Sequence, residues 1–125
     1  MRDSKFSIKD NPVENDDIQY AFDYNGLGAR LKDIETIVAE VAGENDGYRW
    51  YWILKMKDGT FSWAMGSCDY TGWDCQSDAE IYDGYKNAED AIAAVEVGTD
   101  SRTKIKECLY GQVKGDIPFA IYQES

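Results

Sequence analysis

The chain has no histidine and only three cysteines among its 125 residues, and these shortages exclude several kinds of site. Structural zinc sites take cysteine and histidine ligands in closely spaced pairs, whereas Cys68, Cys75 and Cys108 form no CxxC pair. A cysteine nucleophile would also lack the histidine base that commonly activates it. We therefore expect no zinc site and no cofactor. In a reducing cytosol we expect free thiols, with Cys108 as a small core residue, while a bridge between Cys68 and Cys75 stays open.

Long apolar runs and positive charges are scarce too. No stretch of about 18 apolar residues is present, and the N-terminus lacks the apolar core of a signal peptide. We therefore expect a cytoplasmic protein without membrane contact. The 24 Asp and Glu residues outnumber the 13 Lys and Arg residues, which leaves a net charge of −11. Because nucleic acids are negative as well, we expect no direct nucleic-acid binding, and the expected partner is a basic protein surface.

The chain does contain enough apolar material for a core, since 43% of its residues are apolar and 14% are aromatic. Its length predicts one domain, residues 1–125, in which residues 1–14 form a partly ordered arm without a sustained period. The periodicity elsewhere predicts an α+β fold. A small antiparallel sheet, made of a central hairpin at 48–67 plus a third strand, is expected to pack against several helices.

The aromatic stretch 48–76 holds all four tryptophans and is expected to organise the fold. Asp58-Gly59 predicts a type I′ turn between two strands with alternating apolar residues. Counting outward from this turn gives the pairs Met56–Phe61, Leu54–Trp63 and Trp52–Met65. We expect this aromatic, methionine and leucine face to be buried under helices. The opposite face, with Tyr51 and Ile53, is expected to be smaller and wetter.

Apolar spacing and capping residues place the other elements. Helices are predicted at 15–24, with Asn15 as N-cap, and at 27–43, 87–98 and 99–115, with an edge-like strand at 79–85. The helix at 27–43 is inferred from an apolar stripe that steps by three and four residues, and a shorter helix capped by Asp33 is the alternative. Asn87 is expected to cap the third helix. Residues 117–122 are expected to form a short strand or a docked tail.

Three motifs carry a resemblance: GENDG at 43–47, KDG at 57–59 and CDYTGWDCQS at 68–77. Together they resemble a set of uncharacterised small proteins from bacteria and their phages. The resemblance covers about a third of the chain. It implies a bacterial or phage source and attaches no activity, cofactor or partner to the chain.

The loop that follows the hairpin is richer in reactive residues than a turn requires. One interpretation is a hydrolase-like enzyme in which Cys75 is the nucleophile and Asp69 or Asp74 orients a base or a water. Neighbouring carboxylates oppose it, since they raise a thiol pKa. The interpretation that we favour is a structural loop, in which Tyr70 and Trp73 pack under the sheet and the aspartates bond turn amides.

Clustered carboxylates are a second candidate site. The turn before the hairpin and the loop after it should meet at one end of the sheet, and they carry Glu44, Asp46, Asp69 and Asp74. Such a group can hold a hard cation or perform acid–base chemistry. Neither EF-hand spacing nor a DxD pair is present, so we expect no metal.

Acidic residues are densest between Asp69 and Asp100, where nine acids accompany one base, Lys86. An ordered acidic face can compete with DNA for a basic protein surface, such as that of a nucleic-acid-binding enzyme. We therefore expect a small acidic interaction protein, a phage or mobile-element inhibitor or DNA mimic being one form of it. An ordinary solubilising surface is the alternative. The expected binding residues are Asp69, Asp74, Asp78, Glu80, Asp83, Glu89 and Asp90.

Overall fold

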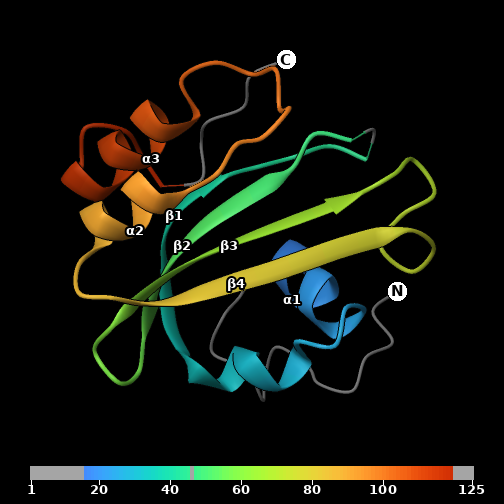
Figure 1. Cartoon of the computed structure of the whole chain (residues 1–125), viewed down its shortest axis with the longest axis horizontal. Coiled ribbons are helices and arrows are strands. Elements are labelled where there is room, and N and C mark those ends of the chain that lie inside the picture. Colours follow the sequence, from blue (N-terminus) through green and yellow to red (C-terminus); the bar gives the residue numbers. More distant parts are fainter. Residues whose placement is uncertain (1–15, 46, 120–125) are drawn as a thin grey trace.

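The computed structural model describes residues 16–45 and 47–119 of the chain. Across them, four antiparallel strands form a sheet in the order β1-β2-β3-β4, with helices on both of its faces (Figure 1). The predicted α+β class is confirmed. The elements are α1 (Asp16–Asp23), the 3₁₀ helix η2 (Gly28–Asp33), β1 (Ile34–Val41), β2 (Trp50–Met56), β3 (Phe61–Cys68), β4 (Ser77–Tyr85), α2 (Ala88–Ala94) and α3 (Ile105–Lys114).

Several predictions fall on the remaining residues and are not tested. The arm at 1–14, the N-cap Asn15, Asp46 and the second half of the 117–122 segment lie outside the described part of the chain. Within that part, no helix is long and apolar enough to cross a membrane.

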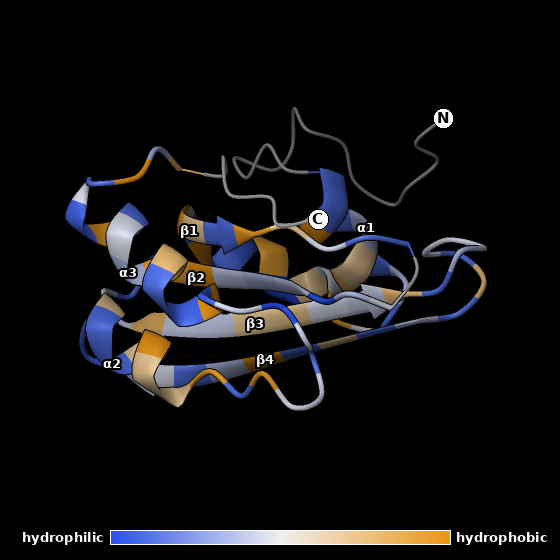
Figure 2. Cartoon of the chain, turned by 90° about the horizontal axis from the view of Figure 1, so that it is seen from above, coloured by the Kyte–Doolittle hydropathy of each residue, from blue (hydrophilic) through white to orange (hydrophobic). Residues whose placement is uncertain are grey.

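The sheet lies between two layers of helices, and each of its faces forms its own apolar cluster. On one face, α1 and η2 cover the sheet through Ile18, Phe22, Leu31, Trp52 and Leu54. On the other face, α2 and α3 cover it through Tyr51, Ile53, Trp63, Ile92 and Leu109. Figure 2 shows α1 on one side of the strands and α2 on the opposite side. Strand β2 is therefore buried from both sides along most of its length.

The β2–β3 hairpin forms where the sequence predicts it, but its register is shifted by one residue. The Met56 N–H donates to the Thr60 carbonyl at 2.9 Å, so the loop contains three residues, 57–59, of which only Gly59 has a positive φ, +93°. A three-residue loop with glycine in the left-handed region is the next common hairpin after the two-residue form. The observed partners are Lys55–Phe61, Ile53–Trp63 and Tyr51–Met65.

The shift changes which residues share a face. The predicted pairs Met56–Phe61, Leu54–Trp63 and Trp52–Met65 are wrong, because a one-residue slip moves one strand's side chains to the opposite face. Trp63 is buried as expected, yet it belongs to the α2/α3 face with Ile53, which was predicted to be the wetter side.

Strand β1 replaces the helix that was predicted at 27–43, and the shorter helix capped by Asp33 is absent from this described segment as well. Its sequence, IETIVAEV, is rich in β-branched residues that favour strands. Two register irregularities, between Ile34 and Thr36 and between Ile37 and Ala39, interrupt the simple alternation. The apolar stripe that suggested a helix therefore does not form one face, because Ile34 packs in the α1/η2 cluster whereas Val38 and Val41 pack in the α2/α3 cluster.

The other elements lie near their predicted places, although α2 ends at Ala94 rather than at the predicted Gly98. Helix α1 and edge strand β4 lie where they were expected, and the Asn87 side chain caps α2 by accepting the Asp90 N–H at 2.7 Å. Helix α3 ends at Gly115, as predicted, but begins at Ile105 rather than at 99–100.

The late start of α3 follows from Arg102, whose side chain is buried in the loop between α2 and α3. Its guanidinium donates to the Asp100 carboxylate and to the carbonyls of Ala42 and Arg49, and it lies 4.9 Å from the Tyr48 ring centre. These contacts hold the loop across the ends of β1 and β2, so the chain cannot be helical there.

Candidate functional site

The segment between β3 and β4, residues 69–76, is an ordered loop. The Asp69 carboxylate accepts the Thr71 N–H at 2.8 Å and the Thr71 hydroxyl, and Gly72 bends the chain at φ +106°. Trp73 then leans on Trp50, with the ring centres 4.8 Å apart. The favoured structural interpretation is correct for Asp69 and Trp73 but wrong for Tyr70, which is 83% exposed.

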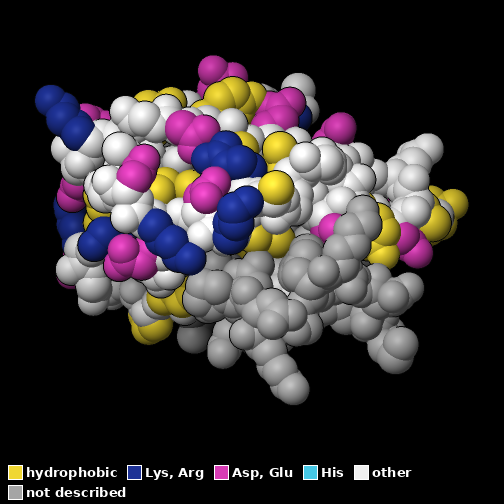
Figure 3. All heavy atoms as spheres, turned by 90° about the horizontal axis from the view of Figure 1, so that it is seen from below, with side chains coloured by type: hydrophobic (Ala, Val, Ile, Leu, Met, Phe, Trp, Pro, Cys, Tyr) yellow, Lys and Arg dark blue, Asp and Glu magenta, His cyan; other side chains and the backbone are white. Residues whose placement is uncertain are grey.

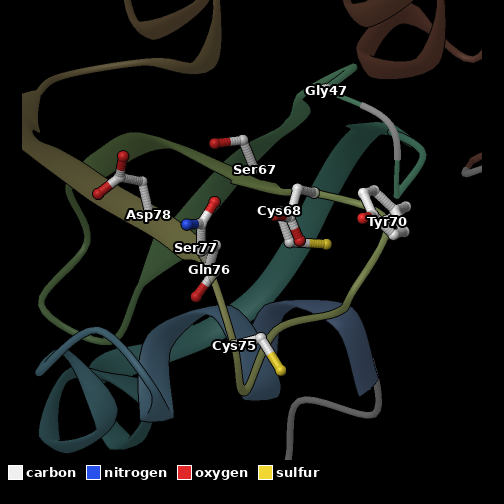
Figure 4. A pocket seen from close by; sticks show the side chains of 9 residues that line it. Gly47, Ser67, Cys68, Tyr70, Cys75, Gln76, Ser77 and Asp78 are labelled. Atoms are coloured by element: carbon white, nitrogen blue, oxygen red, sulfur yellow. The ribbon is translucent and has the colours of Figure 1, made fainter.

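A hollow of about 740 Å³ opens beside this loop (Figure 4). It is lined by four of the residues that were predicted as candidates or cysteines, namely Cys68, Asp69, Cys75 and Asp78. Asp74 and Glu44 are not part of its lining. The predicted partners of Cys75 were Asp69 and Asp74. Asp69 shares the lining with Cys75 but its carboxylate accepts from Thr71, and among the described residues no hydrogen bond joins either aspartate to the Cys75 thiol.

The three thiols differ in environment, and all are free. Cys75 is exposed, and its side chain has no hydrogen-bond partner among the described residues. Cys68 is buried and donates to the Asn45 amide oxygen at 3.2 Å; burial, helped by the charges of Asp17 and Asp69, raises its thiol pKa to about 11. Cys108 is a core residue, as expected, and burial raises its thiol pKa as well. Both raised values oppose thiolate formation.

The predicted carboxylate cluster does not assemble within the described residues. Between 16 and 119, leaving out Asp46, no three acidic or cysteine side chains come together in a way that could hold a metal ion. The Asp69 carboxylate serves its own loop, and the hydrogen bonds from Thr71 and from turn amides lower its pKa. This lowered pKa keeps Asp69 ionised, which suits a turn cap better than a general acid.

The predicted acidic face divides between the two sides of β4. Asp78 and Glu80 are exposed and lie opposite Ser67 and Met65 of β3. Tyr82, two residues further, stacks on Trp63 with ring centres 4.6 Å apart and donates its hydroxyl to Glu80. Glu80, together with the charge of Glu96, raises the pKa of the Tyr82 phenol, and burial adds to the shift. These contacts place Asp78, Glu80, Tyr82 and Glu96 on the α2 side of the sheet, and we call these four residues the acidic β4 face.

Asp83 points to the other side of β4 and is engaged there. It accepts two hydrogen bonds from the Arg30 guanidinium, at 2.9 and 3.1 Å, and one from the Ser62 hydroxyl at 2.8 Å. The Arg30 hydrogen bond contributes most to lowering the Asp83 pKa. The side of the molecule formed by η2 and the β2–β3 turn faces the viewer in Figure 3, where Lys and Arg side chains lie among Asp and Glu side chains. Asp83 therefore does not extend the acidic β4 face.

The remaining predicted acids occupy two further places. Glu89 and Asp90 are exposed in the first turn of α2, which packs against β4 and β3. Asp74 lies in the loop, where it lines a second, smaller hollow of about 200 Å³ together with Tyr20, Tyr24 and Trp73. Sequence reasoning missed this hollow. Its one local signal was the spacing of Tyr20 and Tyr24, which puts both rings on the same side of a helix.

Comparisons with protein-family models, with curated protein sequences and with solved structures give no match to this chain.

Proposed function

We propose that the chain is a small acidic interaction protein whose acidic β4 face binds a basic protein surface. One observation carries the proposal. Asp78, Glu80 and Glu96 are exposed and form no ion pair within the described part of the chain, and Glu80 accepts a hydrogen bond from the hydroxyl of Tyr82, whose ring stacks on Trp63. No Lys or Arg occurs between Lys57 and Lys86, so both β3 and β4 lack a basic side chain that could neutralise these acids.

The geometry of the strand favours recognition over simple solubility. Paired with β3 along its length, β4 has a fixed backbone that carries Asp78 and Glu80, and stacking on Trp63 holds the Tyr82 ring on the same face. Fixed groups lose less conformational entropy on binding than groups on a mobile segment. Tyrosine is also a common anchor in protein interfaces.

The spacing of the charges bears on the kind of partner. Residues on the same face of a strand recur about every 6.6 Å, whereas one DNA strand carries a charge about every 3.4 Å. The charges of the acidic β4 face are thus spaced more widely than those of a DNA strand. Glu89 and Asp90 of α2 add negative charge at one end of this face. A nucleic-acid-binding enzyme offers a basic surface that suits such an array. If the chain comes from a phage or mobile element, it would act as an inhibitor of that enzyme.

The test is affinity capture from bacterial lysate at low and moderate salt. The protein is compared with a variant carrying Asp78→Lys and Glu80→Lys and with a control carrying Glu35→Lys and Glu107→Lys. Both variants change the net charge equally, and the control residues are exposed on β1 and on α3, which packs on β1 at the far edge of the sheet. We expect a partner that wild type and control retain at low salt and that the β4 variant loses. Equal recovery of the same partner by all three proteins would mean that the acidic β4 face only keeps the protein soluble.

A hydrolase-like enzyme that uses Cys75 or clustered carboxylates is the second candidate, and the hollow of about 740 Å³ beside Cys75 is what favours it. Its weakness is that, among the described residues, the Cys75 thiol makes no hydrogen bond to a group that could act as its base. Thiol-ester and peptide-ester turnover by wild type and by Cys75→Ser decides between the two. Binding without any Cys75-dependent turnover agrees with our proposal, and turnover that Cys75→Ser abolishes would replace it with the enzyme.

A further inference from the structure

The small hollow between α1 and the 69–76 loop has walls of an unusual composition. Three of its four lining residues are aromatic, Tyr20, Tyr24 and Trp73, and the fourth is Asp74, whose carboxylate is exposed. Tyr20 and Tyr24 stack with ring centres 6.2 Å apart. Aromatic walls with a carboxylate at the rim are the chemistry that recognises an organic cation, because the face of each ring is electron-rich.

The walls are held in place by contacts that do not involve a ligand. The Asn25 side-chain amide donates to the Ala21 carbonyl at 2.8 Å and to the Ser77 hydroxyl at 3.0 Å, and Ser77 donates to the Trp73 carbonyl at 2.8 Å. This chain of hydrogen bonds ties the end of α1 to the loop. On its other side, Trp73 leans on Trp50, whose indole N–H donates to Asp17 at 3.0 Å. The hollow is therefore already formed before anything binds.

The two described segments that form the hollow, α1 and the 69–76 loop, carry charge of one sign. Helix α1 contains Asp16, Asp17 and Asp23 and no Lys or Arg. The loop contributes Asp69 and Asp74 and again no base. A cation entering the hollow meets ring faces and the Asp74 carboxylate, on two segments that offer no Lys or Arg to an anion.

From these observations we propose that the hollow lined by Tyr20, Tyr24, Trp73 and Asp74 is a binding site for an organic cation, namely the guanidinium or alkylated ammonium group of a basic side chain. The inference deepens the proposed function, on which it rests for the identity of the partner as a basic protein. It adds a site on the α1 face of the molecule, separate from the acidic β4 face on the α2 side. The partner would thus insert one cationic side chain here while its other basic groups meet the strand.

The site can be tested without the partner, by NMR titration of the indole N–H signals with choline. Dimethylbutanol, in which carbon replaces the choline nitrogen, is the neutral isostere of the same shape, and N-acetylarginine methylamide supplies the guanidinium arm. Trp73→Phe assigns the Trp73 signal. We expect choline and the arginine derivative to shift that signal saturably, and dimethylbutanol to leave it in place.

Variants then locate the effect. Tyr24→Leu keeps the apolar bulk but removes a ring face, and Asp74→Asn keeps the shape but removes the charge; each should weaken choline binding about two- to five-fold. Tyr70→Leu, in the same loop but not in the lining, should bind choline like wild type. Equal shifts with choline and dimethylbutanol, or no shift of the Trp73 signal, would overturn the inference. Since Tyr24 is 46% exposed, its variant is expected to fold, and the comparison of the two ligands on wild type stands without any variant.

This test is distinguishable from that of the proposed function. If choline binds but no salt-sensitive partner is found, the cation site is supported and the proposed role of the acidic β4 face is refuted. If instead the Asp78→Lys, Glu80→Lys variant loses a partner that wild type binds, and choline does not bind, the role of the β4 face is supported and the cation site is refuted.

Discussion

The side-chain amide of Gln112 pairs with the backbone of Glu40 as a neighbouring strand would. Its oxygen accepts the Glu40 N–H at 2.8 Å, and its nitrogen donates to the Glu40 carbonyl at 2.8 Å. Glu40 lies in β1, an edge strand of the sheet, and Gln112 comes from α3. An open edge is a template for pairing with another chain, so α3 closes β1 at this position. The opposite edge, β4, is instead protected by charge.

Replacing Gln112 by leucine should destabilise the protein by about 2 to 4 kcal/mol, because it leaves a backbone donor and acceptor of Glu40 without partners in a buried place. Urea denaturation measures the loss, and hydrogen exchange should show faster exchange of the Glu40 amide. Gln76→Leu, at an exposed position, is the control and should change the free energy of unfolding by less than about 0.5 kcal/mol. An unchanged Glu40 exchange rate in Gln112→Leu would contradict the pairing.

The three-residue hairpin loop predicts a specific preference at position 59. Gly59 has φ +93° and nothing within 4 Å of the place where a Cβ would stand, so only backbone strain opposes a side chain there. Gly59→Ala should cost about 1 kcal/mol, and Gly59→Asn less, since asparagine tolerates the left-handed region better. Thermal unfolding of both variants checks this. Equal losses for alanine and asparagine would mean that the loop has another geometry.

The buried pair of Asp100 and Arg102 predicts a dependence of stability on pH. The two side chains are 1% and 3% exposed and lie 2.8 Å apart. Burial alone would raise the Asp100 pKa, but the hydrogen bonds and charge of Arg102 outweigh it and the pKa is lowered. A lowered pKa in the folded state contributes stability above the unfolded value of about 3.9, and this is lost as the pH falls through the folded value.

Asp100→Asn should therefore destabilise the protein at neutral pH by about 3 to 5 kcal/mol, because it removes the negative charge of Asp100 from beside the buried Arg102 guanidinium. The difference from wild type should be constant above about pH 5 and should shrink below about pH 4. Denaturant unfolding from pH 3 to 7 measures it, with Glu44→Gln, at an exposed turn position, as control. A difference that does not shrink in acid would show that the Asp100 charge is not what stabilises the loop.

The sequence predicted elements whose signal is local and missed those that depend on tertiary contacts. The location of the hairpin turn at Asp58-Gly59, the Asn87 cap and the Gly115 terminus follow from a few neighbouring residues, and all three are present, although the turn is a three-residue loop and the predicted type I′ turn is wrong. The hairpin register could not be chosen by burial, because β2 is buried on both faces and either pairing hides apolar side chains. The start of α3 depends on Arg102 reaching carbonyls about 50 and 60 residues away in the chain.

The same distinction applies to the candidate sites. Strand alternation already separates Asp83 from Asp78 and Glu80, since residues an odd number of positions apart lie on opposite faces. Counting acids along the segment concealed this separation. The aromatic hollow needs Trp73 to fold back onto α1, which no local pattern indicates.

The most direct test of the central claim is the rate at which the protein associates with its captured partner as salt is varied. Stopped-flow mixing of purified proteins, followed by tryptophan fluorescence, gives this rate for wild type, for the Asp78→Lys, Glu80→Lys variant and for the Glu35→Lys, Glu107→Lys control. We predict that the wild-type rate falls at least about tenfold between roughly 0.02 and 0.2 M salt, and that the β4 variant is slow at every salt concentration while the control follows wild type. A rate that is independent of salt and equal in all three proteins would contradict a binding role for the acidic β4 face.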